Sequence, residues 1–299
     1  MSLEAASPLR CLSGRGGVAS AGKSGWHRWE GGIRSIDMQA EVDPQARFGG
    51  IERLYGAGTL ARLERARVCV VGLGGVGSWA VEALARSGVG AITIVDLDDV
   101  CVTNINRQLP ALEGTIGRPK AEVLAERVLA INPECQVEAR LEFFTESTAG
   151  ALLEPGRFEW VIDAIDALKN KALLIARCRA VGLPVVTCGG AGGRRDATGV
   201  RVADLAFTHR DPLLRYVRKK LRSRHGFPRD VDQPFGVPAI YTQEPPLYPG
   251  ADGRLCEAPL PDAETGINCA GGLGAASFVT GAFGFAAAAV VVNALAAAG

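Results

Sequence analysis

The sequence predicts an α/β protein with a Rossmann-like doubly wound sheet, parallel in its N-terminal half and mixed or antiparallel in a C-terminal extension. Two observations lead to this fold class. From residue 67 onward, short apolar runs typical of buried strands alternate with segments whose apolar residues recur at helical spacing. A glycine-rich turn, residues 72–77, joins the first such run to the first such segment. Strands that alternate with helices form parallel βαβ units with right-handed crossovers.

The expected elements follow one another in a regular order through most of the chain. We expect strands at residues 67–71, 91–95, 137–141, 160–162 and 183–188, and helices at residues 76–87, 120–131 and 168–180. Gly88 favours the end of the first helix, and Pro119 is typical of the beginning of the second. The remainder is less regular. Residues 211–224 predict a basic amphipathic helix, and the Pro-rich residues 230–261 predict a loop or a short strand.

The composition indicates a globular protein of ordinary type. Of its 299 residues, 47% are hydrophobic and 22% are charged. The 33 Lys and Arg nearly balance the 32 Asp and Glu, and the formal net charge of +1 excludes a general polycation. Any contact with nucleic acid must therefore come from a local patch. None of the 8 Cys forms a C-x-x-C pair, so we expect no zinc site, free thiols and a cytoplasmic location.

The two ends of the chain differ from its middle. Residues 1–46 carry glycine and serine without a periodic apolar pattern, and we expect a disordered extension there, with targeting or partner contact as the alternative. Residues 47–299 are expected to form a single domain. Residues 265–299 contain no charged residue. This tail is long enough to cross a bilayer but lacks basic anchors, which favours a buried helix or a dimer interface and leaves peripheral membrane contact open.

The glycine-rich turn predicts a phosphate-binding loop. Gly72, Gly74 and Gly77 form a G-x-G-x-x-G pattern, with Gly75 as a further bare position. Backbone without side chains lets phosphate oxygens approach, and the N-terminus of the following helix offers unpaired N–H groups. Asp96 follows the next strand, where a carboxylate binds ribose hydroxyls. The pattern indicates a nucleotide without separating NAD from ATP, and a turn without a ligand is the alternative.

The polar residues that follow favour a triphosphate over a dinucleotide. They are Asp98, Asn104, Arg107, Gln108 and Lys120. Arg107 can bind phosphate oxygens with two N–H groups, and Lys120 can supply a point charge. Asp166 follows a later strand, at the edge of the sheet where a carboxylate can hold Mg²⁺ together with phosphates. Simpler interpretations are a surface ion pair for Arg107, a solvated first-turn position for Lys120 and a helix cap for Asp166.

Short motifs occur in a fixed order along the chain. They lie at residues 47–56, 99–108, 131–135, 161–166, 189–193 and 281–285. Their order resembles the ubiquitin-activating-enzyme-like adenylating superfamily and, within it, the tRNA threonylcarbamoyladenosine dehydratases. The resemblance implies that residues 47–299 form one adenylating domain that uses ATP and Mg²⁺. It also implies a homodimer, because such relatives often borrow an arginine from the partner subunit. Arg53 is our candidate for that arginine and Arg47 the second choice.

The resemblance implies ATP-dependent cyclisation of N6-threonylcarbamoyladenosine at position 37 of tRNA. ATP would activate the threonyl carboxylate as an acyl-adenylate, and an internal nitrogen or oxygen would then close the ring with net loss of water. The first step needs no general base, because a carboxylate is already ionised at neutral pH. By resemblance, phosphate is held by Gly74 and Gly77, ribose by Asp96, the triphosphate by Asn104 and Arg107, the α-phosphate by Lys120 and Mg²⁺ by Asp166. Gly72, Gly75, Asp98 and Gln108 complete the expected nucleotide site.

Other functions remain open. The main alternative is activation of a small ubiquitin-like sulfur-carrier protein, although its relatives usually bind zinc through two C-x-x-C pairs that this chain lacks. An NAD-dependent oxidoreductase and a non-catalytic RNA-binding scaffold are further alternatives. Some dehydratases carry a Cys where this chain has Ala239, so a covalent thioester at that position is excluded. Proteins of a sulfurtransferase system are candidate partners.

A dense basic segment predicts a contact surface for tRNA. Residues 210–224 contain seven Lys and Arg on a helix with its own apolar stripe. The candidate tRNA-binding residues are Arg215, Arg218, Lys219, Lys220 and Arg222. Contacts from these side chains to phosphates would be independent of sequence and sensitive to salt. An ordinary solvated helix face is the alternative.

Overall fold

The computed structural model describes residues 43–250, 253–258 and 273–298. These described residues form one compact unit. Helix α1 (Pro44–Tyr55) begins inside the range that the sequence assigned to a disordered extension, so the boundary expected at residue 46 is too late. Asp43 caps the helix by accepting a hydrogen bond from the backbone N–H of Gln45, 2.9 Å, and Pro44 fits the first turn. The rest of the expected extension lies outside the described residues.

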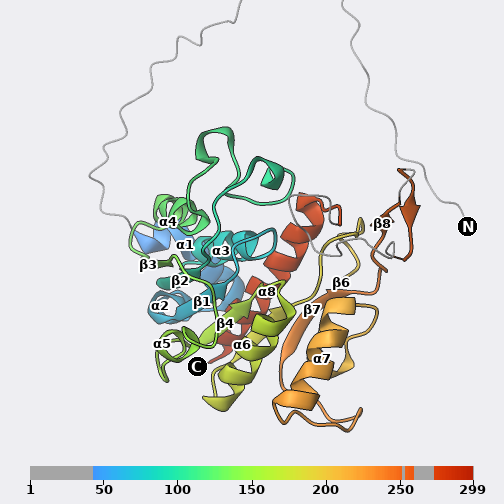
Figure 1. The fold of residues 1–299 in the computed structure, drawn as a ribbon. Helices are drawn as coiled ribbons and strands as arrows, with labels where there is room; N and C mark the ends of the chain where they lie inside the picture. The colour runs from blue at the N-terminus through green and yellow to red at the C-terminus, as the bar shows by residue number, and fades with distance from the viewer. Residues whose placement is uncertain (1–42, 251–252, 259–272, 299) are drawn as a thin grey trace, which may run out of the picture. The chain divides into compact units, whose positions relative to one another are not determined.

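A seven-stranded sheet forms the centre of the unit (Figure 1). Its strands lie in the order β3 (Gln136–Arg140), β2 (Ala91–Val95), β1 (Arg67–Val71), β4 (Trp160–Asp163), β5 (Val185–Cys188), β7 (Pro238–Thr242) and β6 (Val200–Asp204). All neighbours pair in parallel except β6, which runs antiparallel to β7. The strand order changes direction between β1 and β4, as in doubly wound sheets. The predicted fold class, with its mixed C-terminal extension, is confirmed.

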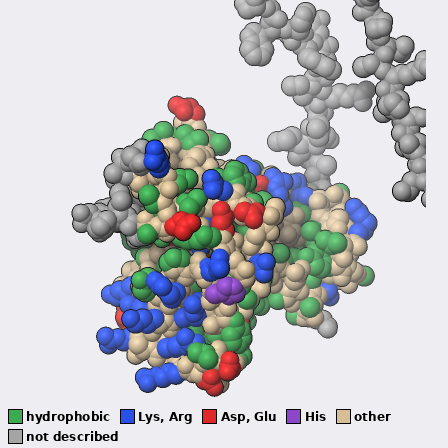
Figure 2. All heavy atoms as spheres, turned by 90° about the vertical axis from the view of Figure 1, so that its right-hand side faces the viewer, with side chains coloured by type: hydrophobic (Ala, Val, Ile, Leu, Met, Phe, Trp, Pro, Cys, Tyr) green, Lys and Arg blue, Asp and Glu red, His purple; other side chains and the backbone are tan. Residues whose placement is uncertain are grey.

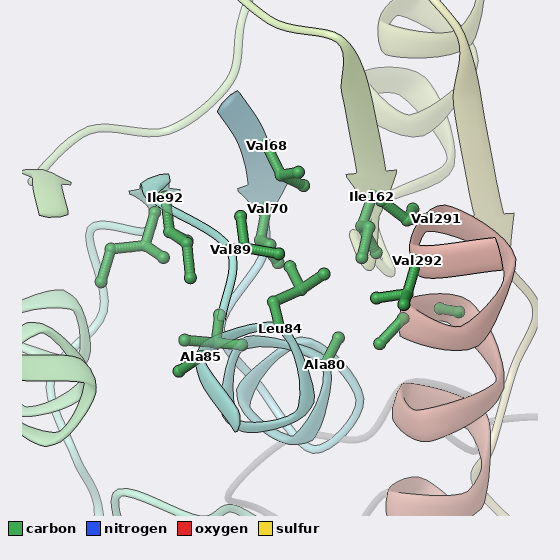
Figure 3. Packing of buried hydrophobic residues seen from close by; sticks show 14 of the residues in the cluster. Val68, Val70, Ala80, Leu84, Ala85, Val89, Ile92, Ile162, Val291 and Val292 are labelled. Carbon is green, nitrogen blue, oxygen red and sulfur yellow. The ribbon is translucent and has the colours of Figure 1, made fainter. Parts of the chain in front are cut away.

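The sheet separates two apolar cores, because side chains alternate along each strand. The first core includes α3 (Gly77–Arg86), α4 (Lys120–Ile131) and α8 (Ser277–Ala297), and the second includes α5 (Ala149–Leu152), α6 (Leu168–Ala180) and α7 (Pro212–Arg224). In β1, Val68 and Val70 join the first core, whereas Cys69 joins the second. Figure 3 shows Val70 near Leu84 of α3 in the first core. Full burial of each such side chain contributes about 1.5–3 kcal/mol.

Shorter elements complete the fold. They are α2 (Thr59–Arg65), the hairpin of β8 (Tyr248–Pro249) and β9 (Leu255–Cys256), and single 3-10 turns at Val102–Asn104, Glu113–Thr115 and Leu205–Phe207. Strand β7 lies in the Pro-rich stretch where a loop or a short strand was expected. Strand β6 had no counterpart among the expected elements. It is an edge strand that exposes Arg201 and Val202, so it lacks the continuous apolar run of a buried strand.

The charge-free tail forms α8, which packs closely on α3. A Cβ on Gly284 would lie 2.5 Å from the carbonyl oxygen of Val76 and 2.8 Å from Cβ of Trp79, so this crossing requires glycine. Among the described residues, α8 is the one helix long and apolar enough to cross a membrane, yet 56% of that stretch is buried. The expected buried helix is therefore observed. A dimer interface and membrane contact stay predictions.

Candidate nucleotide-binding site

The glycine loop lies at the carboxyl end of β1, against the ends of β2 and β4. The backbone N–H of Gly72 donates to the carbonyl oxygen of Val95, 3.0 Å. Gly72 has a φ of 90°, and a Cβ there would lie 2.8 Å from the carbonyl oxygen of Ala164. A Cβ on Gly77 would lie 1.8 Å from the carbonyl oxygen of Gly72. Both positions require glycine, and the loop leads directly into the N-terminus of α3.

Asp96 stands at the end of β2 with its carboxylate turned toward this loop. Its Oδ2 accepts from the backbone N–H of Leu73, 2.6 Å, and its Oδ1 accepts from that of Asp98, 2.9 Å. Burial raises the pKa of Asp96 above its ordinary 3.8, and the two N–H groups and Lys120 oppose that rise. A carboxylate accepts about four hydrogen bonds, so capacity remains for ribose hydroxyls. The predicted ribose role fits this geometry and stays a prediction.

Asn104 and Gln108 lie on the crossover segment that follows β2. Oδ1 of Asn104 accepts from the backbone N–H of Cys101, 3.0 Å, so this amide shapes the turn. Nε2 of Gln108 lies 3.8 Å from the point that a Cβ on Gly74 would occupy. Oε1 of Gln108 is one of two buried side-chain atoms without a hydrogen-bond partner among the described residues. An open acceptor beside the glycine loop fits a bound nucleotide, because leaving a buried polar atom unpaired is unfavourable.

Arg107 is held against the first turns of α3 and α8. Its carbonyl oxygen accepts from the indole N–H of Trp79, 3.1 Å, and from the hydroxyl of Thr280, 3.2 Å. Its guanidinium donates to the carbonyl oxygen of Thr103, 2.8 Å. Only 9% of Arg107 is exposed, so it is not a surface side chain. A guanidinium carries five donors, which gives this residue the capacity to bind phosphate oxygens as well.

Lys120 opens α4 but is buried. Its Nζ donates to Oδ2 of Asp98, 2.8 Å, and its backbone N–H donates to the carbonyl oxygen of Asp98, 3.0 Å. The Lys120 side chain is 6% exposed, whereas that of Asp98 is 54% exposed. The interpretation of Lys120 as a solvated first-turn residue is therefore wrong. The pair places an ammonium group beside Asp96 at the carboxyl edge of the sheet, where it can attract a phosphate.

Asp166 lies on the exposed turn that follows β4. The N-cap of α6 is Ala167, with no side-chain cap, so the interpretation of Asp166 as a cap is wrong. The same turn touches the glycine loop through Ala164 and Gly72. Among the described residues, no group of three or more His, Cys, Asp or Glu could hold a metal ion. A Mg²⁺ ion at Asp166 would take most of its oxygen ligands from ATP phosphates and water.

A buried ion pair beneath this turn was missed by the sequence analysis. Nζ of Lys171 lies 3.0 Å from Oδ2 of Asp163, and both side chains are fully buried. Lys171 also donates to the carbonyl oxygen of Ile165, 2.8 Å, and the Thr187 hydroxyl donates to Asp163, 2.6 Å. These bonds fix the turn that carries Asp166. A lysine on the buried face of a predicted helix, following an aspartate at a strand end, was the available signal.

The arginine expected from a partner subunit lies away from the glycine loop in its own chain. Arg53 belongs to the last turn of α1. Arg47 donates to the carbonyl oxygen of Ile131 at the end of α4, 2.9 Å. Phe48 packs on Gly88, just past the end of α3 opposite the loop. Neither arginine is therefore brought to the site within one chain, and a role across a subunit interface stays a prediction.

The five candidate tRNA-binding residues lie on α7. One surface hollow of about 450 Å³ is lined by Arg215, Arg218, Lys219, Arg222, Ser223 and Arg229. It includes four of the five candidates and leaves out Lys220. Figure 2 shows many Lys and Arg side chains gathered on the lower part of the face that α7 occupies. The structure therefore groups these side chains, and their contact with tRNA stays a prediction.

One carboxylate joins α7 to the edge of the sheet. Oδ1 of Asp211 caps α7 by accepting from the backbone N–H of Leu214, 2.9 Å. Its Oδ2 accepts from the backbone N–H of Gly190, just beyond β5, 3.0 Å, and from the guanidinium of Arg194, 3.3 Å. Both Asp211 and Arg194 are buried. The sequence analysis identified neither, although the Asp-Pro start of a helix indicated the cap.

These features define a class of protein: a doubly wound α/β protein built to bind a nucleotide at the carboxyl edge of its sheet. The switch between β1 and β4 lies at the glycine loop, where such folds bind their ligands. Comparison with known families narrows the class. The family model described as the ThiF family matches residues 49–296. The chain therefore belongs to the ThiF family.

Similarity to individual proteins points to one branch of that family. The chain is 47% identical over 261 residues to the tRNA threonylcarbamoyladenosine dehydratase of Haemophilus influenzae, covering 87% of this chain and 97% of the relative. The crystal structure of the Escherichia coli tRNA N6-threonylcarbamoyladenosine dehydratase in complex with ATP is similar, with a TM-score of 0.74 and 44% identity over 84% of this chain and 94% of that chain. The sulfur carrier protein adenylyltransferase of Thermus thermophilus matches only 42% of this chain and 45% of its own length, at 37% identity.

Proposed function

We propose that the chain catalyses the reaction for which its relatives are named, the ATP-dependent dehydration of tRNA threonylcarbamoyladenosine to its cyclic form. One observation carries this conclusion: in a chain that spans 97% of a dehydratase relative, Asp96 accepts a hydrogen bond from the backbone N–H of Leu73 in the glycine loop and lies beside Lys120. The resemblance inferred from the sequence motifs is confirmed at the level of the family and of its enzymes.

The first step joins the threonyl carboxylate to AMP. A carboxylate oxygen attacks the α-phosphorus of ATP, the bond to the β-phosphate bridge breaks, and pyrophosphate leaves with its electron pair. The product is an acyl-adenylate. An ionised carboxylate needs no base, but its repulsion from the triphosphate must be neutralised and its approach aligned. Arg107, Lys120 and the first N–H groups of α3 supply positive charge for that purpose at the edge of the sheet.

The second step closes the ring. A nitrogen or oxygen within the threonylcarbamoyl group attacks the activated carbonyl carbon, the bond to AMP breaks, and AMP leaves while the attacking atom loses its proton. Attack within one molecule has a low entropic cost, so no enzyme thiol is required. The buried Cys69 and Cys188 fit this, because burial raises the pKa of each thiol and keeps it protonated. The balance over both steps is loss of water from the nucleoside and conversion of ATP to AMP and pyrophosphate.

A magnesium ion held by ATP and Asp166 is part of this proposal. The ion would neutralise phosphate charge when bound. Asp166 supports it because its carboxylate is exposed and lies on the turn packed against the glycine loop. The Asp163–Lys171 pair holds that turn in place from below. Calorimetric titration of ATP with and without Mg²⁺, on the protein and on its Asp166→Asn variant, checks the assignment.

We also propose a homodimer with a cytoplasmic location. The outer face of α8 exposes Phe278 by 60% and Phe285 by 48%, and large aromatic side chains on a surface are typical of interfaces. A dimer would also provide the setting in which Arg53 of one subunit could reach the other. Among the described cysteines, Cys69, Cys135, Cys178, Cys188 and Cys256 are free thiols, in keeping with a reducing compartment. A sulfurtransferase-system partner remains a proposal that pull-down of the full chain can test.

The decisive experiment is incubation of the purified chain with ATP, Mg²⁺ and tRNA that carries threonylcarbamoyladenosine. Nucleoside mass spectrometry should show loss of one water per modified adenosine, with release of AMP and pyrophosphate. ATP hydrolysis without that mass change would contradict the substrate assignment. ATP–pyrophosphate exchange that requires a ubiquitin-like carrier protein would instead support the alternative. The short, partial match to carrier-activating relatives already disfavours it.

A further inference from the structure

The hollow on α7 concentrates five positive charges on a small area of surface. Its charged lining consists of Arg215, Arg218, Lys219, Arg222 and Arg229. In the part of the chain that the structure describes, none of these five side chains forms an ion pair with a carboxylate. Crowded like charges oppose folding, so a cluster of this kind adds nothing to stability. Its presence indicates an anionic ligand.

Two of the guanidinium groups are held rigidly. Arg218 is half-buried, and its Nη1 donates to the hydroxyl of Thr208. Nε of Arg222 donates to the carbonyl oxygen of Pro228, 3.0 Å, and its guanidinium lies 5.1 Å from the ring centre of Phe235. Burial lowers the pKa of Arg218, and the nearby Arg222 lowers it further. Each guanidinium uses one of its five N–H groups in these hydrogen bonds, so other donors remain for a ligand.

The side chains at the rim of the hollow are exposed by comparison. Lys219 and Arg229 are exposed. Arg215 lies over the ring of Tyr216, 4.9 Å from its centre, and Tyr216 is itself 48% exposed. A basic hollow beside an exposed aromatic ring matches the way proteins bind RNA, with cations on phosphates and rings on unstacked bases.

We propose that this hollow is a preformed site for a backbone phosphate of the tRNA substrate, with Arg218 and Arg222 as fixed contacts and Arg215, Lys219 and Arg229 as adjustable ones. The proposal rests on the proposed function and extends it from the reacting nucleoside to the RNA backbone. Planar guanidinium groups bind phosphate oxygens through paired N–H donors, which suits a phosphodiester. The sequence analysis identified four of these five residues, whereas Arg229 enters through the fold alone.

An anionic membrane is the alternative ligand for the hollow. The buried apolar face of α7 argues against membrane binding. Helices that lie on membranes insert their apolar face between lipid headgroups. The apolar face of α7 consists of Leu214, Val217 and Leu221, each 0% exposed in the second core. This face is therefore unavailable for insertion. Arg218 and Arg222, which are held by hydrogen bonds within the fold, also differ from the flexible Lys and Arg of membrane-binding segments.

The hollow also lies on the helix that is tied to the nucleotide edge. Asp211 caps α7 and binds Gly190 at the end of β5, 3.0 Å. Arg215 is one turn beyond that cap. RNA held in the hollow would therefore lie on the element that is attached to the edge where ATP is expected to bind.

Binding of tRNA as a function of salt concentration tests the proposal. The Arg229→Gln variant removes an exposed cation, and Arg65→Gln, on the exposed end of α2, is its matched control. Loss of one phosphate contact should weaken tRNA binding about 3–10-fold near 100 mM salt and reduce the slope of log K against log salt by roughly 1. The double variant Arg218→Gln/Arg222→Gln should weaken binding at least about tenfold. The KM for ATP should stay unchanged in all variants.

Different measurements test the phosphate site in the hollow and the proposed dehydratase activity. Cyclisation by the unmodified chain tests the function, and the salt slopes test the hollow. Equal slopes for the unmodified chain, Arg229→Gln and Arg65→Gln would overturn the site. So would weaker binding of Arg229→Gln to vesicles containing phosphatidylglycerol while its tRNA affinity is unchanged. Thermal unfolding of each variant checks the fold, and Arg229→Gln keeps the test decisive if the half-buried pair fails to fold.

Discussion

The nucleotide edge and the basic hollow on α7 both concentrate charge, but they are built in opposite ways. At the edge, each buried lysine has a carboxylate partner: Lys120 pairs with Asp98 at 2.8 Å and Lys171 with Asp163 at 3.0 Å. In the hollow, five cations stand together, and within the described part of the chain none has such a partner. Paired charges define positions, whereas unpaired charges attract a ligand from a distance.

This difference indicates a division of labour. The edge must align a carboxylate with one phosphorus atom, and that requires fixed geometry. In our proposal the hollow binds a large polyanion, and such binding requires net charge and tolerates small displacements. Substitutions at the edge should therefore damage folding or chemistry, while those in the hollow should change affinity for tRNA and its dependence on salt.

The largest effect is expected at the buried pair. Lys171→Met leaves the fully buried carboxylate of Asp163 without its cation, and should lower the free energy of unfolding by about 3–5 kcal/mol. Urea denaturation followed by circular dichroism measures this. The double variant Lys171→Met/Asp163→Leu removes both charges and should recover part of the loss. Equal stability of Lys171→Met and the unmodified chain would show that the pair does not hold the edge together.

Arg107→Ala should reduce catalysis with little effect on tRNA binding. A charge-assisted hydrogen bond to phosphate contributes about 1.5–3 kcal/mol, so kcat/KM for ATP should fall about 10–100-fold. Single-turnover formation of AMP measures the change. Arg86→Ala is a control, because Arg86 is at the far end of α3 and pairs with Glu82. A similar loss in both variants would remove Arg107 from the triphosphate site.

Charge reversal on α7 should weaken tRNA binding without affecting the ATP site. Lys219→Glu/Lys220→Glu is expected to weaken tRNA binding about tenfold at low salt and to leave ATP binding unaltered. The difference should shrink as salt rises, because counterion release contributes less. Filter binding across a salt series measures both trends. Unchanged tRNA affinity at low salt would return α7 to the role of a solvated helix face.

The smallest effect concerns pH. Burial raises the pKa of Asp96 above 3.8, so its carboxylate takes up a proton at a higher pH than an exposed aspartate does. The folded state then binds this proton more tightly than the unfolded state, and the contribution of Asp96 to stability falls as pH rises through the folded-state pKa. ATP affinity should follow the ionised form and weaken as pH falls. Titrations of Asp96→Asn should lose this dependence, whereas tRNA binding by the arginines should be flat over the same range.

Most of the sheet was predictable from sequence, because buried parallel strands are continuous apolar runs and glycine positions are dictated by local geometry. β1, β2 and the loop from Gly72 to Gly77 follow from neighbouring residues alone. β6 was not predictable in this way. It is an edge strand whose partner β7 lies far along the chain, and its exposed side chains resemble those of a loop.

Within the candidate site, sequence reasoning found the residues with local motifs and missed those defined by long-range contacts. Asp163 and Lys171 meet only because β4 and α6 fold back on each other. Arg194 reaches Asp211 across 17 positions of the chain. Arg229 enters the hollow through the loop after α7. Local patterns mark some of these residues, such as a lysine on the buried face of a predicted helix, but they do not identify the partner, since each pairing depends on where the sheet places separate segments.

The carboxylate of Asp211 joins two separate parts of the fold. One oxygen begins the helix that carries the basic hollow, and the other holds the backbone beyond β5. Because one carboxylate makes both contacts, the first turn of α7 and the backbone beyond β5 are held together by a single short side chain.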